Sequence, residues 1–311
     1  MNPAFSVVIF TAISGAAQGL VVAIALAAMG GVALSTAFVS TALIVAAAML
    51  VIGLGASFLH LGRPERAWRS AMMWRTSWLS REVIVLPAFI GLVALWWLAL
   101  RLDAPPSLLR WLLPLGALGL AALLWLCTGM IYACLRFIEE WAHPLTLVNF
   151  VLVGLSSGFV LAAALGSLVG EGAFVALAAP AALIATLAAA VTRFMALRRN
   201  AQLRHRSTLQ TATGIRAPQL VQKAMGMTAG SFNTREFFHH ASLATLRHVR
   251  LILGALGYAL PVLLAAWALA SASTWPWLLA VLVQAPGLVA DRWFFFAQAK
   301  HPQNLYYQVV S

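Results

Sequence analysis

The chain has 311 residues, of which 62% are hydrophobic and 9% are charged, and its formal net charge is +12. Because a soluble domain has about 25% charged residues, this composition excludes a water-facing globule and indicates an integral membrane protein. The positive charge comes from arginine, apart from Lys223 and Lys300. Without a soluble domain to bind nucleic acid, arginines beside membrane spans explain it better, so we expect lipid and not nucleic acid as a partner.

Eight apolar runs are long enough to cross a bilayer as helices, which takes about 20 residues each. In chain order they are 4–29, 36–59, 83–100, 109–135, 147–169, 173–195, 250–271 and 275–297. The runs are continuous and do not alternate every two residues, which favours helices over a β-barrel. The first run lacks a preceding basic segment and is too long for a signal-peptide core, so we expect it to be retained. The sequence therefore predicts an all-α fold, a bundle of eight transmembrane helices forming a single domain over residues 1–311.

Small residues and cysteines inside the spans point to packing. Gly15 with Gly19, and Gly154 with Gly158, have the GxxxG spacing that permits close helix contact. The only two cysteines, Cys127 and Cys134, share one span and cannot supply a four-cysteine cluster. All seven histidines lie in loops or at span ends, so we expect no metal site, although a haem held by His60 and His248 stays open.

The loops predict the orientation in the membrane. With eight spans, both termini share the side that receives the loops 60–82, 136–146 and 196–249, which carry most of the arginines. Only Arg101 and Arg110 fall on the opposite side. Because cytoplasmic loops carry the excess of Lys and Arg, both termini are predicted to be cytoplasmic. The loop 196–249 is long for a transmembrane connection, so we expect a docking platform for a partner, with a membrane-hugging linker as the alternative.

The loop HLGRPERAWRSAMMWRTSWLSRE, residues 60–82, concentrates arginines, tryptophans and ionisable groups between two apolar runs. His60 closes the second span and Glu82 opens the third, so we expect them at one depth where the two helices adjoin. An imidazole and a carboxyl group placed so can exchange protons with a lipid-soluble carbonyl compound. A quinone fits, because its reduction takes up two protons with two electrons. Interfacial anchoring and ion pairing of these side chains remains the alternative reading.

Charged pairs elsewhere are less specific. Asp291 and Arg292 are adjacent near the last span, and we expect them to form a salt-bridged pair facing the bundle interior. Glu139 and Glu140 stand directly before the fifth span, where they either neutralise neighbouring arginines or relay protons.

The ordered motif of HLG, a following Pro and Arg, and a Ser-x-Glu at the start of the next helix resembles a known family. That family is the DmsC-like membrane anchor subunits of complex iron–sulfur molybdoenzymes. The segments MNPAFSVVIF, HPLTLVNFVLVGLSSG, SFNTREFFHH and KHPQNLYYQ are similar to the branch found in cytoplasm-facing, quinone-dependent sulfite dehydrogenases. The resemblance runs along essentially the whole chain.

The resemblance implies eight helices, no haem, and a site for ubiquinone or menaquinone at His60 and Glu82, the residues that match the family motif. It implies two partners: a four-cluster ferredoxin-like iron–sulfur subunit and a catalytic subunit holding molybdopterin guanine dinucleotide. Iron–sulfur clusters and pterin would sit only in those partners. Around the pair, we expect the loop arginines to hold the partner or lipid headgroups and the tryptophans to frame the entrance; these residues are Arg66, Trp68, Arg69, Trp74, Arg75, Trp78 and Arg81.

The predicted function is therefore that of a membrane anchor and quinone-reactive subunit of an oxidoreductase complex in the bacterial inner membrane. It would pass electrons from the iron–sulfur subunit to quinone, and the cytoplasmic loops favour sulfite oxidation as their source. Two alternatives remain: the anchor of a dimethyl sulfoxide reductase-type complex that oxidises quinol, and a purely structural anchor. A solute transporter is disfavoured, because no internal repeat is visible and the spans are nearly uncharged.

Overall fold

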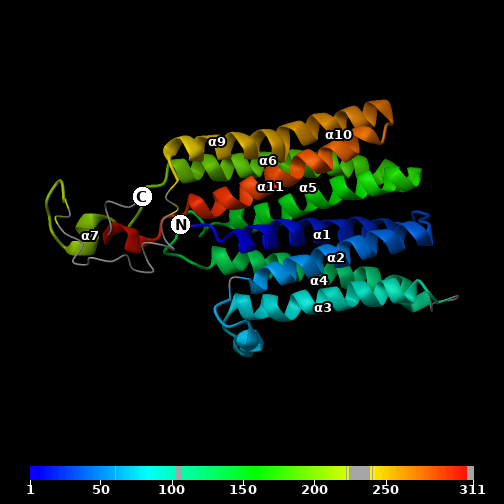
Figure 1. Ribbon diagram of the computed structural model, residues 1–311, viewed down its shortest axis with the longest axis horizontal. Coiled ribbons are helices and arrows are strands. Elements are labelled where there is room, and N and C mark those ends of the chain that lie inside the picture. Colours follow the sequence, from blue (N-terminus) through cyan, green and yellow to red (C-terminus); the bar gives the residue numbers. More distant parts are fainter. Residues whose placement is uncertain (60, 103–106, 222, 224–238, 240, 307–311) are drawn as a thin grey trace.

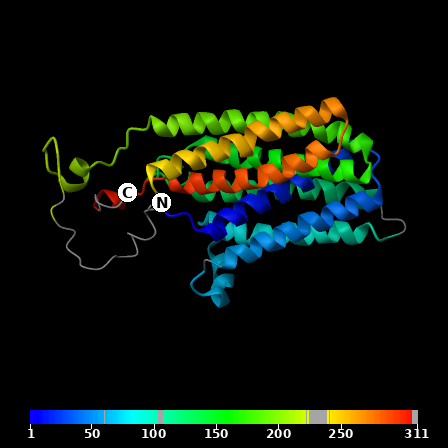
Figure 2. The same cartoon turned by 45° about the horizontal axis from the view of Figure 1, so that its top comes forward.

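The structure, a computed structural model, describes residues 1–59, 61–102, 107–221, 223, 239 and 241–306. In this part of the chain, eight helices long and apolar enough to cross a membrane lie side by side in one bundle (Figures 1 and 2). They are α1 (Phe5–Met29), α2 (Thr36–Phe58), α3 (Trp78–Ala99), α4 (Ser107–Ala133), α5 (Pro144–Val169), α6 (Gly172–Ala201), the composite α9–η2–α10 (Leu243–Gly254, Ala255–Ala259 and Leu260–Ser271) and α11 (Trp275–Ala297). The predicted eight-helix fold is confirmed.

The short elements outside the spans gather at one end of the bundle (Figure 1). They are the 3-10 helix η1 (Pro64–Met73), α7 (Leu209–Thr213) and the 3-10 helix η3 (Pro302–Tyr306). The Met1 nitrogen donates a hydrogen bond to the Ala299 carbonyl at 2.8 Å, so the N-terminus lies beside the segment that follows α11. We call this the arginine-rich end, because the loops on this side carry most of the arginines. Among the described arginines, only Arg101 and Arg110 lie at the opposite end, beside the α3–α4 connection.

Three of the predicted spans were too short at the arginine-rich end. Helix α3 begins at Trp78, α6 continues to Ala201, and the seventh span begins at Leu243. Two of these starts carry serine caps: the Ser77 and Ser242 side chains accept hydrogen bonds from the backbone three residues on. An apolar run marks only the part of a helix inside hydrocarbon, whereas polar turns continue into the headgroup region. Glu82 consequently lies inside α3, and Arg193 lies two turns before the end of α6.

Helix α1 is the centre of the bundle, packing against α2, α4, α5 and α11. Its closest approach is to α5, where the two predicted GxxxG pairs meet. A Cβ atom added to Gly19 would lie 2.9 Å from Gly158 Cα and would overlap the Gly154 carbonyl. The close approach predicted from glycine spacing is therefore confirmed, and the two motifs are each other's partners.

This contact predicts a loss of stability when Gly158 becomes Ala. The new methyl group would overlap the backbone at Gly19, and overpacking of this kind costs about 1–3 kcal/mol. The matched control is Gly119→Ala on α4, where an added Cβ meets nothing within 4 Å. We expect the thermal unfolding midpoint of the detergent-purified chain to fall for Gly158→Ala and to hold for Gly119→Ala. Equal midpoints for the two variants would contradict the packing.

Candidate functional site

Glu82 is buried within the second turn of α3 and faces α4. Its side chain is 5% exposed, and the Thr128 hydroxyl of α4 donates a hydrogen bond to its Oε1. No ion pair to Glu82 is formed by the residues that the structure describes. An unpaired carboxyl group is expensive to place inside a membrane protein, and such groups are typical of functional positions. Thr128 was not a predicted site residue, because a single threonine in an apolar span gives no distinguishing signal.

His60, the other half of the predicted pair, lies outside the described residues. The helices on either side are placed: α2 ends at Phe58, α3 begins at Trp78, and the two helices pack against each other. The predicted convergence of His60 with Glu82 stays a prediction.

The predicted binding residues of the loop fall into two groups. The first group lies on or beside η1, where no residue is buried. It comprises Arg66, Trp68, Arg69, Trp74 and Arg75, and the Trp68 side chain is 61% exposed. Arg69 and Arg75 each lie over the ring of the preceding tryptophan, at 5.5 and 5.4 Å. These side chains form an outward-facing surface of arginine and aromatic groups. They precede α3 in the chain and do not belong to the buried surroundings of Glu82.

The second group, Trp78 and Arg81, belongs to the first turn of α3 next to Glu82. The Arg81 guanidinium lies 4.2 Å from the centre of the Trp78 ring. It also donates hydrogen bonds of 2.9 Å to the carbonyls of Trp74 and Arg75. Arg81 therefore fastens the end of the loop to α3 and fixes the backbone immediately before Glu82.

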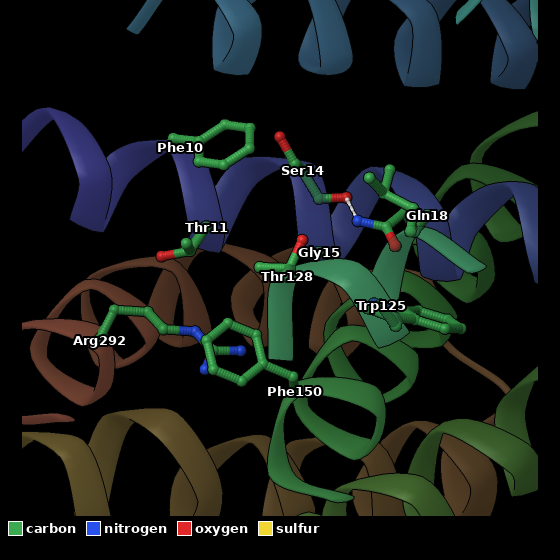
Figure 3. Close-up of a pocket in the computed structure, with 10 residues that line it drawn as sticks. Phe10, Thr11, Ser14, Gly15, Gln18, Trp125, Thr128, Phe150 and Arg292 are labelled. Atoms are coloured by element: carbon green, nitrogen blue, oxygen red, sulfur yellow. Dashed lines mark hydrogen bonds between the residues drawn. The ribbon is translucent and has the colours of Figure 1, made fainter. Parts of the chain in front are cut away.

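A small cavity lies among α1, α4, α5 and α11, and Thr128 is part of its lining (Figure 3). Its volume is about 10 Å³, and its polar lining comes from Thr11, Ser14, Gln18, Trp125, Thr128 and Arg292. Four buried atoms of the lining residues have no hydrogen-bond partner among the described residues: Ser14 Oγ, Gln18 Oε1, Trp125 Nε1 and Arg292 Nε. Of these, Ser14 Oγ is turned toward Gly53 of α2 and away from the cavity. Buried polar atoms are almost always paired, so such a concentration marks an unusual place.

A buried charge cluster adjoins this cavity. Arg193 Nε donates to Asp291 Oδ1 at 2.6 Å, and a second guanidinium nitrogen donates to the Asp291 carbonyl at 3.2 Å. The interior position expected for Asp291 and Arg292 is confirmed, but the pairing was wrong: the partner of Asp291 is Arg193. Neighbouring residues on a helix point about 100° apart, and Arg292 instead lies 4.0 Å from the centre of the Phe150 ring.

A second cavity of about 10 Å³ lies between this cluster and the arginine-rich end. Its charged and amide lining comprises Glu140, Asn149, Arg193, Asn200, Asp291, Arg292 and Gln298. Glu140 is buried; its Oε1 lies 3.5 Å from His205 Nε2, and its Oε2 has no hydrogen-bond partner within the described residues. Neighbouring Glu139 accepts a hydrogen bond from the Arg206 backbone at 2.8 Å, so the two glutamates hold the chain that follows α6.

A larger groove of about 640 Å³ lies elsewhere, between α6 and α9–η2–α10. Its walls are mostly apolar, with Phe194 and Tyr258 among them, and Arg198 and Arg250 also line it. It involves neither α3 nor α4. Its volume would suit a ligand better than the small cavities do. The buried carboxyl group of Glu82, however, lies between α3 and α4.

Eight apolar spans, a short arginine-rich loop between the second and third, and a buried glutamate at the start of the third define a polytopic membrane anchor. The chain belongs to the DMSO reductase anchor subunit (DmsC) family, whose model matches residues 1–297. It is 46% identical, over the full length of both chains, to a sulfite dehydrogenase subunit of Allochromatium vinosum. It is also 36% identical to the anaerobic dimethyl sulfoxide reductase chain YnfH of Escherichia coli, over 37% of this chain and 41% of that one.

The protein is thus a multi-pass membrane anchor subunit of a molybdoenzyme complex, as the resemblance implied. Among the residues that the structure describes, no three His, Cys, Asp or Glu side chains are grouped to hold a metal ion. Cys127 and Cys134 are both free.

Proposed function

We propose that this subunit is the quinone-reactive part of its complex and passes electrons from an iron–sulfur subunit to membrane quinone. The observation that carries the proposal is Glu82, a buried carboxyl group with a hydroxyl partner and, among the described residues, no cation. A quinone carbonyl becomes a hydroxyl on reduction, so a proton donor is needed beside it, and a carboxyl group at the edge of the membrane supplies one. His60, on the other side of the loop, is proposed to hydrogen-bond a quinone carbonyl.

The surface around η1 is proposed to receive the iron–sulfur subunit. Its exposed tryptophans, methionines and arginines lie at the same end of the bundle as the start of α3, so a partner bound there brings its electrons close to Glu82. Arginine and tryptophan are the side chains that contribute most to protein interfaces. This end is proposed to face the cytoplasm of a bacterial cell, because cytoplasmic loops carry the excess of Lys and Arg.

The substrate is proposed to be sulfite, because the full-length relative is a sulfite dehydrogenase subunit. Sulfite and water give sulfate, two protons and two electrons in the catalytic partner, which would hold molybdopterin guanine dinucleotide. The electrons then convert quinone and two protons into quinol at this subunit. The four-cluster ferredoxin-like partner is proposed to connect the two reactions.

The proposal is tested by comparing two electron acceptors. Membranes holding the whole complex, and the same complex expressed without this chain, are assayed for sulfite oxidation with a soluble dye and with a quinone analogue. We expect both forms to reduce the dye and only the complete complex to reduce the quinone. Equal quinone reduction without this chain would refute the proposal.

A further inference from the structure

The two small cavities adjoin each other in the interior of the bundle, one beside Thr128 and the other beside Glu140. Both are lined by Arg292 and Phe150, so the two cavities meet at these side chains. One cavity reaches Thr128, which donates to Glu82, and the other reaches Glu140. We propose that these cavities hold water and form a proton-supply route from Glu140 through Thr128 to Glu82. The inference rests on the proposed quinone chemistry.

The residues that line the first cavity include both donors and acceptors for a bound water. Trp125 Nε1 and Arg292 Nε are donors, and Gln18 Oε1 is an acceptor, each without a partner among the described residues. The Thr128 hydroxyl donates its hydrogen to Glu82, so its oxygen can accept a hydrogen bond from a water in the cavity. A volume of about 10 Å³ holds about one water, which needs two to four polar partners.

Thr128 is the link between that water and the carboxyl group. Figure 3 shows it at the centre of the cavity lining, between α1 and Arg292. A hydroxyl group donates one hydrogen bond and accepts up to two. It can therefore take a proton from the water on one side while giving its own to Glu82 on the other.

The second cavity continues the route outward. Glu140 has one carboxyl oxygen beside His205 and one without a partner among the described residues, and it contributes to the cavity wall. His205 is partly exposed, so its imidazole can take up a proton at one nitrogen and release it from the other. These two side chains form the proposed opening of the route.

Arg292 guides protons and does not carry them, because a guanidinium group keeps its own protons. Its charge would repel a passing proton. Arg193 adds to this repulsion. The carboxyl groups of Asp291 and Glu140, which line the same cavity, offset the charges of both arginines. For each quinone reduced, two electrons arrive from the iron–sulfur partner and two protons enter through the route to complete the quinol.

The test uses the complete complex, with quinone turnover normalised to its dye-linked rate. Thr128→Val keeps the shape of the side chain and removes the hydroxyl, and we expect about a 10²-fold loss of quinone turnover, the lower end of the range for positioned proton transfer. Thr128→Ser restores the hydroxyl and should recover most of the rate. Glu140→Gln, remote from Glu82, should slow turnover comparably, whereas Glu139→Gln, which lines neither cavity, serves as the control and should not.

Hydrogen isotopes separate proton supply from a change of structure. When proton delivery limits the rate, exchanging H₂O for D₂O slows turnover further, so we expect a larger isotope effect in Thr128→Val and Glu140→Gln than in the unaltered complex. Wild-type turnover and isotope effect in both variants would overturn the route. That result would leave the proposed function standing if Glu82→Gln is inactive; an active Glu82→Gln complex would refute the role of Glu82 itself.

Discussion

Replacing Glu82 by Gln is expected to lower quinone reduction by the assembled complex about 10²–10⁴-fold, the range by which a positioned acid or base accelerates a reaction. Glutamine keeps the length of the side chain and its carbonyl oxygen can still accept from Thr128, so the packing of α3 against α4 should persist. It cannot release a proton at neutral pH. Turnover is measured with a quinone analogue and compared with the dye-linked rate, which reports how much complex has assembled.

The matched control is Glu171→Gln at the opposite end of the bundle. Glu171 stands before α6 and accepts hydrogen bonds from Ser35, and it has no part in the proposed site. We expect it to leave quinone turnover unchanged. If Glu82→Gln also turned over quinone at the normal rate in a fully assembled complex, Glu82 would not be the proton donor.

The second large effect is expected at the buried ion pair. Asp291→Asn should lower the free energy of unfolding by about 3–5 kcal/mol, the cost of leaving a buried charge without its partner. Arg193, Asp291 and Arg292 are each no more than 3% exposed, and the carboxyl group is the only one of the three that is negative. Its removal therefore leaves two cations in the interior.

The control for this prediction is the double variant Arg193→Met with Asp291→Asn. Because it removes a cation along with the anion, it should be more stable than Asp291→Asn alone. Comparing the double variant with both single variants, Arg193→Met included, gives the coupling between the two side chains. Unfolding of the detergent-purified chain, followed by heat or denaturant, gives the three values. A double variant as unstable as the sum of the two single variants would contradict the pairing.

The fold could be predicted because its signal is long and continuous. An apolar run of about 20 residues has few other uses, and all eight predicted runs became helices. The ends of the helices could not be predicted in the same way. Polar residues such as Arg198 and Arg247 continue a helix beyond the hydrocarbon, and hydropathy carries no signal for that.

The candidate site could be predicted only in part. Glu82 was found because a carboxyl group at the start of a span is conspicuous, but Thr128 became its partner through the rotation of α4, which the sequence does not encode in any short pattern. The partner of Asp291 comes from 98 residues earlier in the chain. Adjacent charges suggested Arg292 instead, although the helix turns the two side chains in different directions.

The location of the quinone is the central claim, and photoaffinity labelling tests it most directly. A photoreactive quinone analogue is cross-linked to the complete complex, and the labelled peptides are identified by mass spectrometry. Label in the first turns of α3 around Glu82, or on α4 around Thr128, is the predicted result. Label confined to the groove between α6 and α9–η2–α10, at Phe194 or Tyr258, would contradict it.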